Sequence, residues 1–199
     1  MAEAAGEDAR VVAALGGDAQ ALEALLCEHG PHVARGLRID ARWRRLLEVD
    51  DVMQVTYLEA FLRVRALRAR TAAGFVAWLA RSAEHNLRDA VRELGRLKRP
   101  DAHGRATRGA GDSAWTLLAG LSAGAPTAGG LAAGREAVEG LLRAIETLPA
   151  SYARVVREVD LAERPVGEVA DELGRSAGAV HMLRARAHDR LRELLGGAG

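Results

Sequence analysis

The chain has 199 residues, a net charge of +1 and one cysteine. It contains no run of eighteen apolar residues, which excludes a membrane-spanning helix and leaves room for one large soluble domain or two small ones. The acidic N-terminal stretch MAEAAGEDAR lacks the features of a secretory signal, so we expect a cytoplasmic protein, and Cys27 cannot form an internal disulfide.

Charge and helical spacing divide the chain further. Residues 1–60 hold six arginines against eleven acids, a net charge of −5, whereas residues 61–108 hold twelve basic residues against four acids, a net charge of +8. The second block is therefore a candidate surface for a polyanion. Strand signals are nearly absent, so the predicted fold class is all-α, with two small helical domains joined by a flexible linker.

The N-terminal domain is predicted at residues 1–99, with four or five helices. Gly16-Gly17-Asp18 predicts a turn followed by a helix N-cap, Gly30-Pro31 predicts a break, and another break is expected near Asp40. Two apolar stripes predict the core of a helical bundle: Val52, Val55, Leu58 and Leu62, then Phe75, Leu79, Ala83, Leu87, Ala90, Val91 and Leu94.

An acidic helix start, EVDDVMQVTYLEAF, contains the first stripe. Asp51 and Gln54 have the spacing of a capping-box variant, and acidic residues suit the start of a helix. Helix capping alone is therefore sufficient to explain these residues. An exposed Met53, with Gln54 and Tyr57 beside those acids, would equally suit a protein partner.

A basic stripe is predicted on the helix that follows, where four side chains recur at intervals of four, three and four residues: Arg81, His85, Arg88 and Arg92. Like charges at this spacing oppose helix formation slightly, a cost that a polyanion partner would relieve. The alternative is a surface of ion pairs, Glu84 with Arg88 and Asp89 with Arg92. This pattern does not decide between the two.

Residues 100–134 are rich in Gly, Ala, Ser and Thr and predict a linker. Its one apolar group, Trp115, Leu117, Leu118 and Leu121, could form a short helix that docks on a domain.

The C-terminal domain is predicted at residues 135–199, and its stretch VGEVADELGRSAGAVHMLRARAHDRL has the pattern of a helix-turn-helix motif. Gly174 is placed for a left-handed C-terminal position and Ser176 for the next N-cap. The second helix is expected to bury Val180, Leu183, Ala187 and Leu191.

The positive charge of this domain falls on that second helix. Residues 149–174 hold three arginines against six acids, whereas residues 175–199 hold five arginines against two acids. Arg175 and Ser176 are placed for phosphates at the helix start. His181, Met182, Ala185 and Arg186 point away from the core stripe and could meet base edges, with Arg184 intermediate. A solvated face in an ordinary bundle is the alternative.

Taken together, DDVMQVTYLEAF, FVAWLARSAEHNLRDAVREL, a Gly-rich linker and the helix-turn-helix stretch closely resemble the extracytoplasmic-function class of bacterial RNA polymerase sigma factors. The resemblance implies an N-terminal region 2-like domain and a C-terminal region 4-like domain. It implies core RNA polymerase as partner, through the clamp helices of the largest subunit and the flap of the second-largest. Promoter DNA is the other partner, as duplex and as melted non-template strand. Regulation by an anti-sigma factor stays open.

The resemblance also implies residue roles. Polymerase docking falls on Asp50, Asp51, Met53, Gln54, Tyr57 and Glu59. Recognition of the minus-ten element falls on Arg81, His85, Asn86, Arg88, Asp89, Arg92 and Arg96. The helix-turn-helix, with Arg175, Ser176, His181, Met182, Arg184, Ala185 and Arg186, would read the minus-thirty-five element. Where the family usually has Asn, seven residues after the Trp, this chain has His85 followed by Asn86, so the sequence leaves open which of the two faces a captured base.

Linker geometry adds one expectation. Promoter elements two helical turns apart are separated by roughly 70 Å. Thirty-five residues span about 115 Å when extended but about 33 Å as a flexible coil. The free protein should therefore be more compact than the promoter-bound form.

Two other classes of protein compete with this interpretation. A stand-alone helix-turn-helix regulator would use the N-terminal bundle for dimerisation and would bind duplex operators without polymerase. An enzyme is not expected, because GDSAW lies in the linker without a placed base and no phosphate-binding loop is present. Cys27, His29 and His32 lack a fourth ligand, so neither a metal nor a cofactor is expected.

Overall fold

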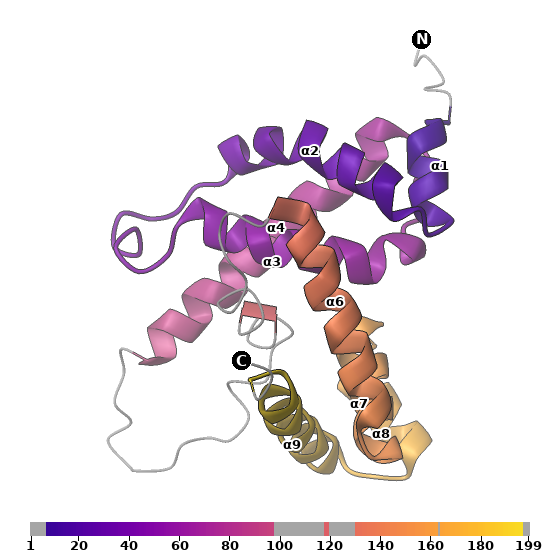
Figure 1. Cartoon of the computed structure of the whole chain (residues 1–199). Coiled ribbons are helices and arrows are strands. Elements are labelled where there is room, and N and C mark those ends of the chain that lie inside the picture. The colour runs from indigo at the N-terminus through magenta and orange to yellow at the C-terminus, as the bar shows by residue number, and fades with distance from the viewer. Residues whose placement is uncertain (1–6, 98–117, 120–129, 163, 197–199) are drawn as a thin grey trace.

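The computed structural model describes residues 7–97, 118–119, 130–162 and 164–196, and within these ranges the chain forms helices and turns with no β-strand. The predicted all-α class is thus confirmed for the described residues. In Figure 1 the first four α-helices form an upper layer, α6 descends from it, and α7, α8 and α9 lie below. None of the described helices has the length and apolarity needed to cross a membrane.

The upper layer consists of α1 (Ala9–Leu15), α2 (Ala19–Gly36), α3 (Val49–Arg63), the short 3-10 helix η1 (Val64–Ala66) and α4 (Ala72–Leu97). Asp18 caps α2 by accepting hydrogen bonds from the backbone N–H groups of Gln20 and Ala21, and Gly17 has a φ of +97°. The predicted turn and N-cap are therefore confirmed. Both predicted stripes lie in the core: Val52, Val55, Leu58, Phe75, Leu79, Ala83 and Ala90 are buried, and Leu62, Leu87, Val91 and Leu94 pack partly buried against them.

The predicted break at Gly30-Pro31 is wrong, because α2 continues through Pro31. Leu25 before it and Val33 after it are both buried, so packing on either side offsets the hydrogen bond that proline removes. Gly30 has a different role, since a Cβ at this position would lie 2.2 Å from the hydroxyl oxygen of Tyr57. The glycine permits close approach of α2 and α3.

The other predicted break, near Asp40, is confirmed, because a turn at residues 41–46 separates α2 from α3. Helix α3 begins earlier than the sequence indicated. Asp51 accepts a hydrogen bond from the backbone N–H of Glu48 at 2.8 Å, which makes Asp51 the third residue of a capping box headed by Glu48. The predicted box of Asp51 with Gln54 is corrected accordingly.

The C-terminal helices are α6 (Gly130–Thr147), α7 (Ala150–Val155), η2 (Val156–Leu161), α8 (Val166–Leu173) and α9 (Ala177–Gly196). Helix α6 begins at Gly130, inside the range expected for the linker, and η2 continues α7 as a wider π-helical turn. Of the apolar group expected in the linker, Leu118 is buried in the core, whereas Trp115, Leu117 and Leu121 lie outside the described residues.

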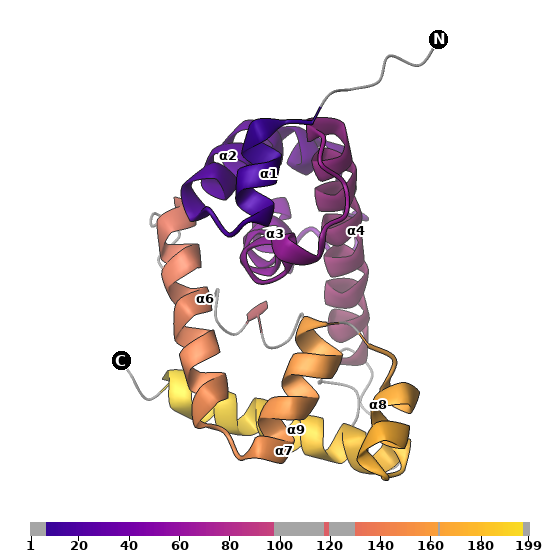
Figure 2. The ribbon, with the colours of Figure 1, turned by 90° about the vertical axis from the view of Figure 1, so that its right-hand side faces the viewer.

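The C-terminal helices pack against the N-terminal ones. Helix α6 contacts both α3 and α9, and together with α4 it joins the upper and lower layers (Figure 2). At its start, Arg135 forms an ion pair with Glu23 of α2 at 3.3 Å. The helix-turn-helix has a separate small core of Val155, Val159, Val169, Ala170 and Val180. The C-terminal part therefore has its own packing and also rests on the N-terminal bundle.

Candidate nucleic-acid interface

The turn between α8 and α9 has the predicted helix-turn-helix geometry. Gly174 is left-handed, with φ of +60°, and the backbone N–H of Arg175 donates to the carbonyl of Ala170 at 2.9 Å. The Ser176 hydroxyl accepts from the backbone N–H of Ala179 at 3.2 Å and caps α9. Both sequence predictions for this turn are confirmed.

The outer face of α9 presents most of the side chains predicted to bind duplex DNA. Arg175, Ser176, His181 and Arg186 are exposed, whereas Met182 and Ala185 are half-buried. The unpaired amides at the start of the helix and its dipole add a positive potential beside Arg175 and Ser176. This face can hold phosphates at its start and reach bases further along.

Arg184 differs from its neighbours because it is bound from within the domain. Its Nε donates to the carboxylate of Asp160 at 2.9 Å, and the other oxygen of that carboxylate lies 2.9 Å from Nε2 of His188. Asp160 and His188 are both fully buried. Arg184, which was predicted to contact DNA, is directed to Asp160 in the free chain, where it positions α9 on η2.

The Asp160 carboxylate is ionised in this arrangement. Burial by itself would raise its pKa, but hydrogen bonds and charge from His188 and Arg184 hold the pKa below its ordinary value. The contacts of Asp160 with Arg184 and His188 fix α9 on η2, and thereby the face that α9 presents.

The predicted stripe on α4 is exposed along its length, with Arg81, His85, Arg88 and Arg92 all facing solvent. The ion pairs of the alternative interpretation are also formed: Arg88 with Glu84 at 3.0 Å, and Arg92 with Asp89 at 2.9 Å. Asp89 also lies 3.4 Å from His85. Exposed pairs of this kind are worth about 0–1 kcal/mol, so a phosphate can compete for each arginine.

A cavity of about 780 Å³ opens beside this stripe. Trp78, Arg81, Ser82 and His85 of α4 line it, together with Arg63 at the end of α3 and the loop after it. Trp78 rests against Phe75, with ring centroids 5.7 Å apart, and is half-exposed. An aromatic surface beside arginines suits an unstacked base and its phosphate.

Of the two candidates left open by the sequence, His85 lines this cavity and Asn86 does not. Asn86 is buried, and its amide donates to Glu59 at 2.7 Å and to the Thr56 hydroxyl at 3.2 Å. Glu59 is buried too and accepts from Arg63. Asn86, predicted to bind the minus-ten element, and Glu59, predicted to bind polymerase, thus lie between α3 and α4 in the free chain and hold these helices together.

The residues predicted to dock on polymerase are partly exposed and partly buried. Asp50 and Asp51 are exposed, and Gln54 and Tyr57 are half-exposed. Burial raises the pKa of the Tyr57 hydroxyl. Met53 was expected to be exposed but is buried in the core at 3% exposure, because it faces inward next to Val52. Of the minus-ten set, the side chain of Arg96 lies outside the described residues.

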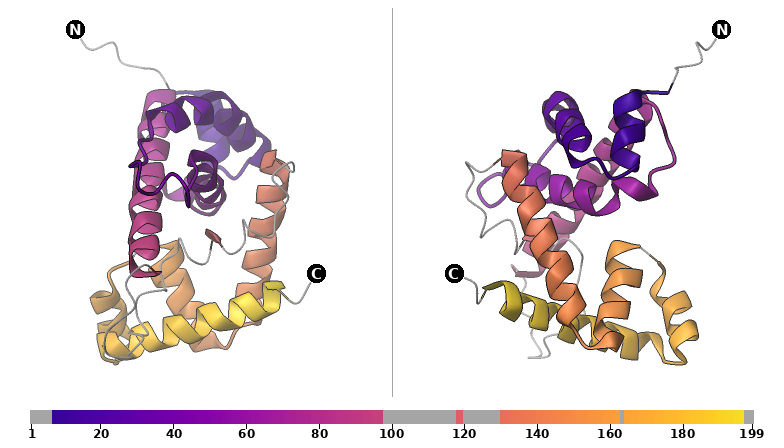
Figure 3. Two further views of the ribbon diagram at one scale, coloured as in Figure 1. Left: turned by 90° about the vertical axis from the view of Figure 1, so that its left-hand side faces the viewer. Right: turned by 45° about the vertical axis from the view of Figure 1, so that its right-hand side comes forward.

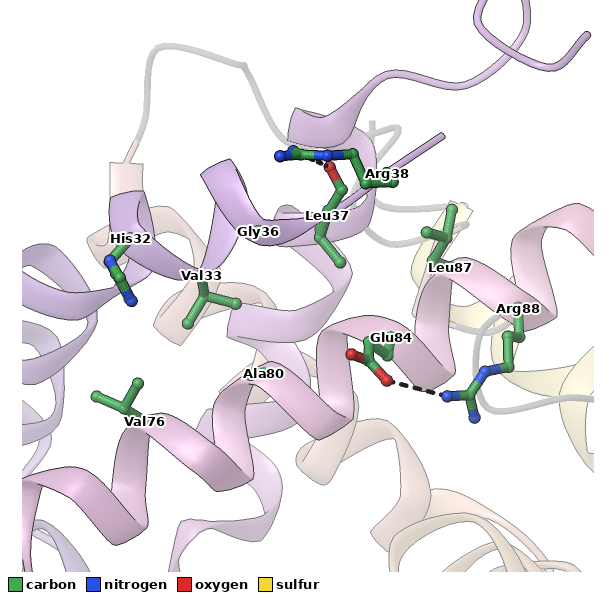
Figure 4. A pocket seen from close by; sticks show the side chains of 10 residues that line it. All are labelled: His32, Val33, Gly36, Leu37, Arg38, Val76, Ala80, Glu84, Leu87 and Arg88. Carbon is green, nitrogen blue, oxygen red and sulfur yellow. Dashed lines mark hydrogen bonds and ion pairs between the residues drawn. The ribbon is translucent and has the colours of Figure 1, made fainter. Parts of the chain in front are cut away.

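A second cavity, of about 430 Å³, lies between α2 and α4 (Figure 4). Val33, Leu37 and Val76 give it an apolar floor, and the Glu84–Arg88 ion pair stands at its edge. Arg88 lines both cavities.

The possible metal ligands of α2 are dispersed. Cys27 is exposed, His29 packs against Phe75 with ring centroids 6.2 Å apart, and His32 lines the second cavity. Within the described part of the chain, no three His, Cys, Asp or Glu side chains are grouped to hold a metal ion.

Asp160, His188 and Arg63 were not among the residues predicted from the sequence. Helical spacing carried a signal for His188, because it follows Arg184 by four residues and precedes buried Leu191 by three. No pattern along the chain linked His188 or Arg63 to Asp160.

A helix-turn-helix with a basic, exposed second helix defines a DNA-binding protein. Residues 139–191 match the family model for sigma-70, region 4, and this match covers the second half of α6, all of α7, η2 and α8, and most of α9. A search of the curated proteins found no match to the chain.

Proposed function

We propose that this chain is a sigma factor of the extracytoplasmic-function class, which binds core RNA polymerase and directs promoter-specific initiation. The observation that carries the proposal is the region 4 match, which coincides with a capped helix-turn-helix that exposes Arg175 in its turn and His181 and Arg186 on its second helix. In this proposal α9 reads the minus-thirty-five element as duplex DNA.

The N-terminal bundle has the features that recognition of the minus-ten element needs. The exposed stripe on α4 and the cavity beside Trp78 and His85 supply cations and a stacking surface for the non-template strand of the minus-ten element. Extruding a base costs a few kcal/mol, which stacking and charge in such a cavity can offset. Asp50 and Asp51 form an acidic patch, with Gln54 beside it, for the polymerase clamp. The protein would act in the cytoplasm within the holoenzyme.

DNA binding with and without polymerase tests this proposal against a stand-alone regulator. Gel-shift experiments on genomic promoter fragments should give a specific complex only when core RNA polymerase is added with the chain. A specific complex formed by the isolated chain, with no gain on adding polymerase, would establish the regulator instead.

A matched pair of variants tests the docking patch. Asp50→Lys, which reverses an exposed charge at the start of α3, should weaken co-purification with core polymerase. Asp189→Lys, which reverses an exposed charge on α9, should leave co-purification unchanged. Equal retention of both variants would remove α3 from the proposed docking surface.

A further inference from the structure

The loop between α2 and α3 carries a concentration of arginines that the proposed function does not use. Residues 38–45, which we call the basic loop, contain Arg38, Arg42, Arg44 and Arg45 against one acid, Asp40. All four arginines are exposed. The charge of this loop is hidden in the sequence totals, because residues 1–60 as a whole carry a net charge of −5.

The basic loop is an ordered turn anchored on α4. Trp43 is buried at 8% exposure, and the backbone N–H groups of Leu46 and Leu47 donate to its carbonyl at 2.8 and 3.0 Å. A Cβ at Gly95 of α4 would lie 3.9 Å from the Trp43 ring, so loop and helix are in close contact. The left panel of Figure 3 views the molecule from the side of this loop, which crosses α4. The arginines therefore project from a fixed position.

Two of these arginines are oriented by the backbone. The Nη1 group of Arg38 donates to the carbonyls of Arg35 and Leu37 at 2.7 and 3.2 Å. The Nε group of Arg44 donates to the carbonyl of Ile39 at 3.0 Å. A guanidinium has five N–H donors, so these bonds fix its direction and leave donors for a ligand.

The charge of the basic loop is largely uncompensated. Among the acids that the structure describes, none forms an ion pair with Arg38, Arg44 or Arg45, and Arg42 lies 3.6 Å from Asp40. Mutual repulsion of such charges raises the free energy of the folded chain. A bound polyanion would remove that cost.

The basic loop continues the surface that α4 offers to DNA. Arg38 lines the second cavity together with Arg88, and Arg88 also lines the cavity beside Trp78 (Figure 4). From the second cavity the loop follows α4 as far as Gly95. A DNA backbone that leaves the first cavity along Arg88 and Arg92 therefore meets the basic loop.

We propose that the basic loop is a second DNA contact of this domain, which binds phosphates of duplex DNA next to the strand held by α4. Duplex DNA fits better than a single strand, because it carries one negative charge per about 1.7 Å of axis, about twice the density of one strand. Arginine suits this role because its planar fork binds a phosphate through two N–H groups. Phosphate contacts add affinity without sequence selectivity. The place of the loop beside a melted strand rests on the proposed function, whereas its binding to duplex DNA does not.

The salt dependence of duplex binding by the free chain counts these contacts. Each phosphate contact contributes about 0.9 to the slope of log affinity against log salt concentration. Arg44→Gln with Arg45→Gln should therefore lower the magnitude of that slope by about 2. Between about 50 and about 200 mM salt, the affinity of the wild type for a fluorescent duplex of random sequence should fall about tenfold more than the affinity of this variant.

Two matched variants separate the lost charge from a change in folding. Arg44→Lys with Arg45→Lys also lacks the Nε group that binds the Ile39 carbonyl, but it keeps both charges and should retain the wild-type slope. Arg143→Gln with Arg157→Gln removes two exposed arginines of α6 and η2 and should retain it too. A Gln variant of the loop with the wild-type slope, or a Lys variant that loses as much as the Gln variant, would overturn the proposal.

Co-purification with core RNA polymerase tests the other class of partner. If Arg44→Gln with Arg45→Gln weakened co-purification and left the DNA slope unchanged, the loop would bind an acidic protein surface and the DNA contact would be refuted. A chain that drives run-off transcription while the slope is unchanged would refute only the loop contact. A chain whose slope falls as expected but which never binds core polymerase would refute only the proposed function.

Discussion

Replacing Asp160 by alanine should be among the most destabilising single changes in the C-terminal domain. The substitution removes a fully buried carboxylate and leaves two partners unpaired: the buried His188 and the largely buried Arg184. Breaking a buried ion pair on one side costs about 3–5 kcal/mol. The matched control is Asp189→Ala, which removes an exposed pair with Arg192 worth about 0–1 kcal/mol.

Urea unfolding followed by far-ultraviolet circular dichroism is the appropriate assay. The C-terminal helices contain no tryptophan, whereas circular dichroism follows their helical structure directly. With a dependence on urea of about 1–1.5 kcal/mol per molar, a loss of 3 kcal/mol lowers the midpoint by roughly 2–3 M. The control should shift the midpoint by less than about 1 M.

A triple substitution separates the lost charge pairing from the lost volume. Asp160→Leu with Arg184→Met and His188→Leu removes all three polar groups and should recover most of the stability, since apolar residues replace buried ion pairs at little cost. If Asp160→Ala proved no more destabilising than Asp189→Ala, the buried triad would not stabilise the domain and this reasoning would fail.

The remaining predictions concern pH, backbone conformation and DNA selectivity. The pKa of Asp160 is lower in the folded state than in the unfolded state. Its contribution to stability is therefore complete above the unfolded pKa of about 3.9 and is lost as the pH falls through the folded pKa. The difference in thermal unfolding between wild type and Asp160→Asn should accordingly shrink below about pH 4. Gly174→Ala should lower the free energy of unfolding by about 1 kcal/mol, because Gly174 has a positive φ. Gly140→Ala, in α6 with open space for a Cβ, should raise it by about 0.5–1 kcal/mol. Urea unfolding measures both changes. Arg186→Ala and His181→Ala should each change selectivity for the upstream element by about 1–3 kcal/mol in holoenzyme gel shifts, while polymerase binding is retained. The control Arg190→Ala should leave this selectivity unchanged. Loss of holoenzyme assembly would contradict the assigned roles.

Local features of the fold were predictable from the sequence because their causes are local. Asp18, Gly174 and Ser176 act through their own turns, and the apolar stripes on α3 and α4 follow from helical spacing alone. The exposed stripe of the candidate site was found in the same way, because four polar side chains at helical spacing share one face whatever the helix packs against.

Features that depend on contacts between distant segments could not be predicted with the same rules. Pro31 is tolerated because packing on both sides keeps α2 intact, and no local rule measures that packing. Asn86 and Glu59 were assigned to partners through the family resemblance, yet they satisfy each other between α3 and α4. Arg184 is bound to Asp160, twenty-four residues away, through tertiary contact alone.

Asn86 nevertheless left a detectable signal. It follows buried Ala83 by three residues and precedes buried Ala90 by four, so it lies on the apolar face of α4. A polar side chain on such a face is best interpreted as part of a buried hydrogen-bond network before it is assigned to a ligand.

Run-off transcription tests the central claim most directly. Core RNA polymerase and genomic fragments, with and without the purified chain, should give transcripts from discrete start sites only when the chain is present. Transcripts that are the same with and without the chain, under conditions where a known sigma factor activates the same core enzyme, would contradict it.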